Sequence, residues 1–211
     1  QYTTSLNAAI YMSTTPALVL LINKFFFKER ISARNIAGVI LSTVGVIWLV
    51  SQGDMINARV FAHLNQGDFW TMGSALSWAV YCAFLRIKPR EVKGNAFVAV
   101  SALLGAIVLI PVLALELIRN GMPGWNSYAN TGVVTGLAYL VIFPSWLSYL
   151  LWNKGISAIG ATRGEIYSHL IPLSGGLFSV IFLHVTLHSY HLVSALVIMC
   201  GIALCSRPSA K

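Results

Sequence analysis

The sequence predicts an all-α polytopic membrane protein, and three observations lead to this prediction. Of the 211 residues, 57% are hydrophobic and only 9% are charged, whereas soluble domains average about 25% charged residues. Apolar stretches long enough to cross a bilayer, about 20 residues each, recur along the chain. Basic residues gather on alternate loops between these stretches, as they do in multi-span proteins.

Seven spanning helices account for the chain in order. We predict them near residues 8–27, 33–52, 68–87, 95–118, 130–153, 162–183 and 190–206. Of the 14 Lys and Arg residues, all but Arg59 and Arg119 fall on the odd-numbered loops or after the last span. The positive-inside rule therefore places those loops and the C-terminus in the cytoplasm. Because the charge of +8 follows topology in this way, we expect no binding to nucleic acid.

Residues 10–49 match residues 166–205 without a gap, at a constant offset of 156. Identities are few, but they include Pro16 with Pro172 and Gly45 with Gly201. Five spans separate each element from its match, and five is odd, so the two copies must cross the membrane in opposite senses. Inverted repeats with broken helices are typical of secondary transporters. A five-span repeat predicts a ten-helix bundle, of which this chain would carry the fourth to tenth helices and a remnant of the third.

Several segments together resemble the EamA-type transporters of the drug/metabolite transporter superfamily. They are residues 2–9 (YTTSLNAA), 27–30 (FKER), 38–48, 160–163 (GATR) and 169–172 (HLIP). The family often has an acidic-basic pair after the ninth span, as Glu29-Arg30 follows the fourth, but here residues 184–187 read HVTL.

The resemblance implies a ten-helix carrier in the bacterial inner membrane that exports small metabolites such as amino acids. It also implies alternating access around a central cavity. On this reading residues 1–52 are the C-terminal part of the first EamA repeat and residues 53–67 the inter-repeat linker. Residues 68–206 are then the second EamA repeat, and residues 207–211 a cytoplasmic tail.

A polar stripe runs along the sixth predicted span. Its members are Glu165, His169, Pro172, Gly176 and Ser179, whose spacing of 4, 3, 4 and 3 keeps them on one helical face. The first repeat has Ser13, Pro16 and Asn23 at matching positions. Lipid disfavours polar groups, so the stripe should face the bundle interior or a wet cavity. We expect the two prolines to flank the binding site, and the alternative is a kink that serves packing alone.

Aromatic residues with polar tips follow one face of the third and fifth spans and could wall a cavity. Packing between helices and the interfacial belt are the alternatives for each of them taken singly. The predicted cavity lining is Tyr11, Ser13, Pro16, Ser74, Trp78, Tyr81, Tyr139, Trp146, Tyr149, Tyr167, His169 and Pro172.

Glu165 and His169 are the candidates for proton coupling, because each is an ionisable group on the polar stripe. A neutral histidine bonded to a neighbouring helix is an equal alternative for His169. The pattern Thr162-x-x-Glu165 favours a capping box as the role of Glu165. Asp68 has the position of an N-cap for the third span.

Other functional classes find little support in the sequence. His184, His188 and His191 have no acidic or cysteine companion, so we predict no metal site. Neither a cofactor motif nor a nucleophile–base motif is present, which argues against an enzyme. The expected function is a secondary transporter, with a non-transporting scaffold or sensor as the alternative. Its expected partners are a small-molecule substrate and the lipid bilayer, and a homodimer is left open.

Overall fold

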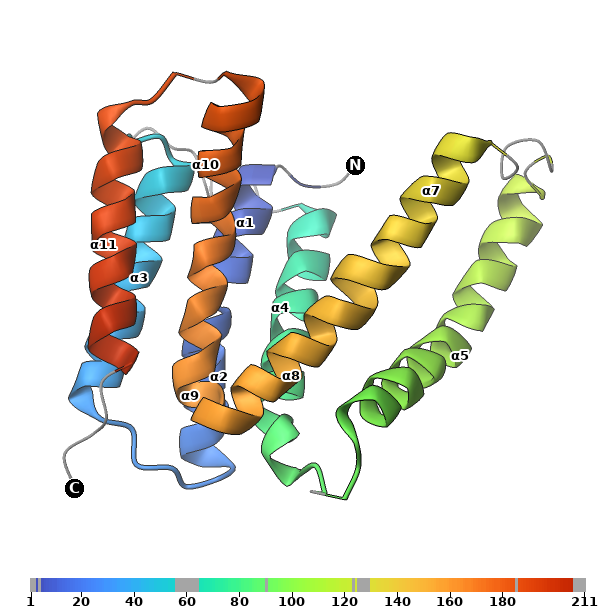
Figure 1. Cartoon of the computed structure of the whole chain (residues 1–211), viewed down its shortest axis with the longest axis horizontal. Coiled ribbons are helices and arrows are strands. Elements are labelled where there is room, and N and C mark those ends of the chain that lie inside the picture. The colour runs from blue at the N-terminus through green and yellow to red at the C-terminus, as the bar shows by residue number, and fades with distance from the viewer. Residues whose placement is uncertain are drawn as a thin grey trace. The chain divides into compact units, whose positions relative to one another are not determined.

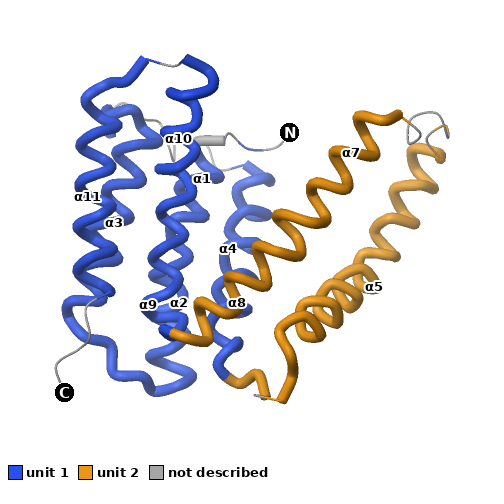
Figure 2. The backbone as a smooth tube through the Cα atoms, in the orientation of Figure 1, with its two compact units in different colours: residues 1–86, 159–211 blue, residues 87–158 orange. Residues whose placement is uncertain are grey.

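The computed structural model describes residues 3, 5–55, 65–89, 91–122, 124, 130–184 and 186–206. The predicted tail, 207–211, and most of the predicted linker, 56–64, lie outside the described residues. All regular structure in the described ranges is helical (Figure 1). The chain divides into two compact units, residues 1–86 with 159–211 and residues 87–158, which Figure 2 shows in different colours.

Unit 1 contains most of the helices. They are α1 (Ser5–Ser13), α2 (Thr15–Phe25), α3 (Ala33–Val50), α4 (Gln66–Phe84), α9 (Ala161–Gly164), α10 (Leu170–Leu183) and α11 (Ser189–Ser206). Two 3-10 helices accompany them: η1 (Leu85–Ile87), which continues α4 across the unit boundary, and η3 (Glu165–His169).

Unit 2 contains α5 (Gly94–Asn120) and a long helix in three parts, α7 (Thr131–Leu140), η2 (Val141–Leu147) and α8 (Ser148–Ile159). The middle part, η2, is a π-helix with Pro144 inside it. A proline removes a backbone donor, and a π-turn is one way in which a helix accommodates the loss. The sequence predicted a span over 130–153; the helix continues to Ile159.

Six helical stretches in the described residues are long and apolar enough to cross a membrane: Asn7–Phe25, Ala33–Val50, Gly94–Asn120, Thr131–Ile159, Ala161–Leu183 and Ser189–Ser206. They correspond to six of the seven predicted spans. The predicted span at 68–87 forms α4 and η1 but is not among the six. Polar residues in α4, including Gln66, Asp68 and Ser74, make it less apolar than the others.

The start of α4 corrects one prediction about Asp68. The N-cap is Asn65, whose side chain accepts from the Asp68 backbone N–H at 3.1 Å. The Asp68 carboxylate accepts in return from the Asn65 backbone N–H at 2.9 Å. This is a capping box with Asp68 at its third helical position, so the prediction that Asp68 is itself the N-cap was wrong.

The two matching segments are interrupted at the same register. Helix α1 ends at Ser13 and α2 begins at Thr15, while η3 ends at His169 and α10 begins at Leu170. Ser13 and His169 differ by the offset of 156. Each proline then falls in the first turn of the second segment, where the missing N–H costs no intrahelical bond. The interruption therefore precedes Pro16 and Pro172.

Helices α3 and α11 also match, because their bounds differ by 156 residues at both ends. They pack side by side (Figure 1) and run antiparallel, since Gly38 lies against Cys205 and Gly53 against Tyr190. A Cβ atom built on Gly201 would lie 2.6 Å from the Ser42 backbone nitrogen. Buried side chains around this contact form the core of unit 1: Leu20, Val39, Val46, Ile166, Ile198, Ile202 and Cys205.

The contacts between α3 and α11 are reciprocal. Ser42 lies against Gly201, and Gly45 lies against Ile198. At the offset of 156, Ser42 matches Ile198 and Gly201 matches Gly45. The first contact therefore becomes the second when each residue is replaced by its match. This is the pattern of a two-fold, isologous interface, in which each surface contacts its own counterpart.

The patterns Gly73-x-x-x-Ser77 and Gly132-x-x-x-Gly136 are of the small-residue kind that lets helices approach closely, but their glycines make no such approach within their units. Nothing in the described residues lies within 4 Å of a Cβ built on Gly73 or Gly136, and Gly132 meets only the side chain of Asn130, its own N-cap. The close approach occurs at the glycines of α3 and α11 instead.

Candidate functional site

The interruption between α1 and α2 is built from three consecutive hydroxyl residues. The side chain of Ser13 donates to the Ile10 carbonyl at 2.7 Å. Those of Thr14 and Thr15 donate to the carbonyls of Tyr11 and Met12, each at 2.6 Å. Pro16 has no N–H for the Met12 carbonyl, and the Thr15 hydroxyl supplies that bond. The helix is therefore interrupted without leaving that carbonyl unsatisfied.

His169 joins the two interruptions. Its Nε2 lies 3.0 Å from the carbonyl oxygen of Ser13, the residue that matches it at the offset of 156, and its Nδ1 lies 2.7 Å from Ser42 Oγ. A carbonyl only accepts, so Nε2 carries a proton, and in the neutral ring Nδ1 accepts from the Ser42 hydroxyl. The His169 side chain is buried. We call Ser13, Ser42 and His169 the crossing point.

Two roles were considered for His169: proton coupling, and a structural role as a neutral histidine bonded to a neighbouring helix. Both ring nitrogens have partners on neighbouring helices, as the structural alternative requires. A role of His169 in proton coupling stays a prediction.

The capping-box interpretation of Glu165 was wrong. The residue before α9 is Gly160, at a φ of 82°, and no side chain caps the helix. Thr162 lies within α9, and its hydroxyl bonds to Asn23 and Glu29. Glu165 instead opens η3, is 1% exposed, and accepts from Trp78 Nε1 at 2.9 Å. The spacing fitted a cap, but a left-handed glycine starts the helix earlier than the pattern assumed.

A polar network connects the ends of three elements of unit 1. Asn23 Nδ2 donates to Thr162 Oγ1 at 2.8 Å, and Thr162 Oγ1 donates to Glu29 Oε1 at 2.7 Å. Arg86 Nη1 donates to Glu29 Oε2 at 2.9 Å and lies 4.7 Å above the centroid of the Phe27 ring. We call Asn23, Glu29, Arg86 and Thr162 the Glu29 network. Sequence reasoning missed the contacts of Thr162 and Arg86, because they join segments far apart in the chain.

Nine of the twelve predicted cavity residues belong to unit 1. Trp78 and Tyr81 are stacked, with ring centroids 5.5 Å apart, and both are half-buried on α4. Tyr11 and Pro16 are buried, whereas Ser74 is exposed. The Tyr167 hydroxyl lies 3.0 Å from Ser206 Oγ, at the end of α11. Pro172 is half-buried in α10.

The other three predicted residues belong to unit 2. Tyr139, Trp146 and Tyr149 are exposed on that unit by 60%, 46% and 39%. The Tyr139 ring lies 5.2 Å from the ring of Phe143. Trp146 lies in the π-helix η2, a type of turn that is common at functional sites. Their role in a cavity stays a prediction.

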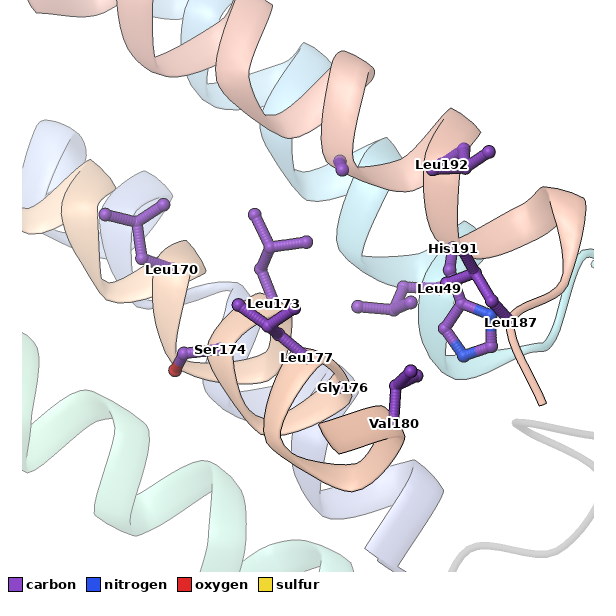
Figure 3. Close-up of a pocket in the computed structure, with 11 residues that line it drawn as sticks. Leu49, Leu170, Leu173, Ser174, Gly176, Leu177, Val180, Leu187, His191 and Leu192 are labelled. Carbon is purple, nitrogen blue, oxygen red and sulfur yellow. The ribbon is translucent and has the colours of Figure 1, made fainter. Parts of the chain in front are cut away.

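A cavity of about 450 Å³ lies in unit 1, between α10, α11 and the end of α3 (Figure 3). Leucines form most of its wall, and His191 and Ser174 are its polar side chains. None of the twelve predicted residues lines it, although Gly176 of the polar stripe does. His191 Nδ1 accepts from the His188 backbone N–H at 3.0 Å. Within the described ranges, no group of three or more His, Cys, Asp or Glu side chains could hold a metal ion.

The helices, their apolar length and the inward-facing polar groups define a multi-pass α-helical membrane protein. The model of the EamA-like transporter family matches residues 1–51 and 65–207. The chain therefore belongs to the EamA-like transporter family.

Relatives of the chain have transporter names. It is 25% identical over 173 residues to the uncharacterized transporter YyaM of Bacillus subtilis, covering 82% of this chain and 55% of that protein. It is 26% identical over 207 residues to an uncharacterized transporter of Archaeoglobus fulgidus, covering 97% and 68%. It is 23% identical over 198 residues to a probable amino-acid metabolite efflux pump of Salmonella typhimurium, covering 92% and 65%. The chain thus spans 55% to 68% of the length of these relatives.

A solved structure shares the fold. A chain described only as "Crystal structure of protein" superposes with a TM-score of 0.74 at 19% sequence identity. The match covers 96% of this chain and 67% of that one. At this identity the likeness concerns the arrangement of helices alone.

Proposed function

We propose that the protein is a secondary transporter that exports small metabolites such as amino acids by alternating access around a central cavity. One observation carries the proposal: the matching helices α3 and α11 pack antiparallel through reciprocal contacts. In the same unit, His169 bonds the backbone of its counterpart Ser13 where both matching helices are interrupted.

The reciprocal contacts give the proposal its physical basis. Antiparallel packing of matching helices is what two repeats of opposite membrane orientation would produce. In a carrier with inverted repeats, each repeat can adopt the conformation of the other, which gives the protein two related states. One state opens the central cavity to one side of the membrane and the other state opens it to the opposite side, which is alternating access. Interrupted helices at the crossing of the repeats provide polar backbone groups at membrane depth, where substrates bind in such carriers.

Topology and boundaries belong to the same proposal. Residues 1–52 would complete a first repeat and residues 68–206 would form the second, with α4 as a seventh span. The distribution of basic residues supports a cytoplasmic C-terminus. We place the protein in the bacterial inner membrane by analogy with the bacterial relatives. The proposed transporter has no catalytic chemistry of its own, and whether it works as a homodimer is a separate question for its oligomeric state in detergent.

The substrate class rests on a relative's name. The Salmonella protein is called a probable amino-acid metabolite efflux pump, and half-buried aromatic pairs such as Trp78 and Tyr81 suit solutes with an apolar body.

Counterflow in proteoliposomes tests the proposal. The intact protein is reconstituted with a panel of unlabelled amino acids inside the vesicles, and uptake of each labelled amino acid is followed with and without a proton gradient. Saturable exchange of at least one solute is the expected result. If folded protein exchanges none of them, the transporter proposal fails and the scaffold or sensor alternative replaces it.

A further inference from the structure

Glu165 is a buried carboxylate with one oxygen in a hydrogen bond and the other without one in the described part of the chain. Oε1 accepts from the indole N–H of Trp78 at 2.9 Å, and the side chain is 1% exposed. Oε2 has no hydrogen-bond partner in the described part of the chain. A carboxylate can accept about four hydrogen bonds. The side chains of Trp78, Cys82 and Ser168 are the donors beside this one, and Oε2 still lacks a partner.

No cation in the described ranges compensates Glu165. Among the described residues the ion pair is between Arg86 and Glu29, and no Lys, Arg or His nitrogen lies within 4.0 Å of the Glu165 carboxylate. The ionisable groups closest to it in the chain are Arg163, Tyr167 and His169. Arg163 is half-buried in α9, the Tyr167 hydroxyl lies 3.0 Å from Ser206 Oγ, and His169 is occupied at the crossing point. From α4, Cys82 is the buried ionisable group near it.

An isolated anion inside a membrane protein has two ways to avoid the cost of burial. It takes up a proton, or it pairs with a cation that arrives from outside. Only one of the two can occupy the carboxyl at a time. A site of this kind therefore exchanges a proton for a cation without changing its net charge.

The surroundings select the kind of cation. Trp78 holds the carboxylate by its N–H edge and is stacked on Tyr81 at 5.5 Å, with both rings half-buried. Aromatic faces attract ammonium groups and accept apolar bodies. Small inorganic cations prefer a shell of several oxygen ligands, and among the described residues Glu165 belongs to no group of three or more His, Cys, Asp or Glu side chains that could hold a metal ion.

We propose that Glu165 Oε2 is the anchor for the ammonium group of an amine substrate, whose apolar part lies against Trp78 and Tyr81. This inference rests on the proposed transport function and narrows its substrate class to cationic amines, including amino acids. When the ammonium group binds, one proton leaves the Glu165 carboxyl, and when the amine leaves, one proton returns. Export of the amine is thereby tied to proton entry.

A matched pair of probes tests the anchor in the intact protein. Phenethylamine and 2-phenylethanol have the same aromatic body, but only the first carries an ammonium group. Binding is measured by titration calorimetry in buffers of different ionisation enthalpy, which also reports the protons released. We expect the amine to bind at least about tenfold more tightly than the alcohol, the effect of a charge-assisted hydrogen bond, with release of up to one proton.

Two variants test whether the amine affinity and the proton release depend on Glu165. Glu165→Gln keeps an acceptor for Trp78 and should reduce amine affinity to that of the alcohol, abolish proton release and leave the alcohol unchanged. Glu116→Gln, which changes an exposed acid of unit 2, should behave as the wild type. Should Glu165→Gln fail to fold, Glu165→Asp keeps the charge and is expected to retain proton release at weaker affinity. Equal affinities for amine and alcohol in the wild type, or undiminished proton release in folded Glu165→Gln, would overturn the proposal.

Counterflow separates this inference from the function on which it rests. If the wild type exchanges solutes and Glu165→Gln exchanges cationic amines equally well, the anchor is wrong and the transporter stands. If the wild type binds the amine with proton release but exchanges no solute, the anchor stands and the transporter proposal fails.

Discussion

Replacement of Gly201 by alanine tests the contact on which the two-fold arrangement depends. A Cβ atom at this position would lie 2.6 Å from the backbone nitrogen and 2.7 Å from the Cβ of Ser42, and 2.7 Å from the Gly38 carbonyl oxygen. Two of these three atoms belong to the backbone, so no rotation of a flexible side chain can make room. Ordinary contact begins near 3.4 Å, and α3 and α11 must separate by about 0.8 Å, the difference between 3.4 and 2.6 Å.

The magnitude follows from the cost of overpacking, about 1–3 kcal/mol. Alanine gains up to about 1 kcal/mol over glycine in a helix interior, which offsets part of that cost. We therefore expect a net loss of about 1–2 kcal/mol. For a chain of this size, about 2–4 °C of Tm corresponds to each kcal/mol, so the expected decrease in Tm is about 2–8 °C.

The assay is thermal unfolding of the intact protein in detergent, followed by intrinsic fluorescence. Gly175→Ala in α10 is the matched control, because nothing described lies within 4 Å of a Cβ atom at that position. The control should leave Tm unchanged or raise it slightly. If Gly201→Ala and Gly175→Ala melt together, the close approach of α3 and α11 is refuted, and with it the observation that carries the proposed function.

Three further predictions concern the Glu29 network and the interruptions. Thr162→Val removes the partner of the buried Asn23 amide and should cost about 1–3 kcal/mol in thermal unfolding; a value near zero would contradict the bond. Arg86→Leu breaks a pair with Glu29 whose side chains are 42% and 30% exposed, so its loss should cost less than about 1 kcal/mol. If Arg86→Leu lowered the free energy of unfolding more than Thr162→Val does, the predicted order of the two variants would be wrong. Pro172→Ala should impair counterflow more than membrane insertion, and equal losses of both would show that the proline serves folding alone.

The sequence predicted the helices well where apolar length and repetition determine them. The predicted spans 33–52 and 190–206 became α3 and α11 with bounds within two residues. Membrane helices are readable in this way because lipid requires every backbone group to be satisfied within the segment. The predicted span at 68–87 forms α4 and η1, but polar residues lower its hydropathy and it is not among the six stretches apolar enough to cross a membrane.

The candidate site was predicted less completely, because spacing along a helix does not specify partners on other helices. The polar stripe correctly placed Glu165 and His169 on a buried face. Nothing in it identified Trp78 as the donor to Glu165 or Ser42 as the partner of His169, which lie 87 and 127 residues away. The prolines indicated that the helices are interrupted, but the hydroxyl residues before Pro16 determine where.

The two matching segments differ where the Glu29 network lies, and under the proposed transport mechanism this difference has a mechanical consequence. At the offset of 156, Asn23 corresponds to Ser179, whose hydroxyl bonds to the Gly175 carbonyl of its own helix. Thr162 corresponds to Leu6, so the second repeat cannot reproduce the bond between Asn23 and Thr162. If the repeats exchange conformations during transport, the exchanged state lacks these hydrogen bonds and is less stable by their net contribution. We therefore expect the resting protein to favour the conformation that keeps the Glu29 network, and Thr162→Val to shift that balance as well as lower stability.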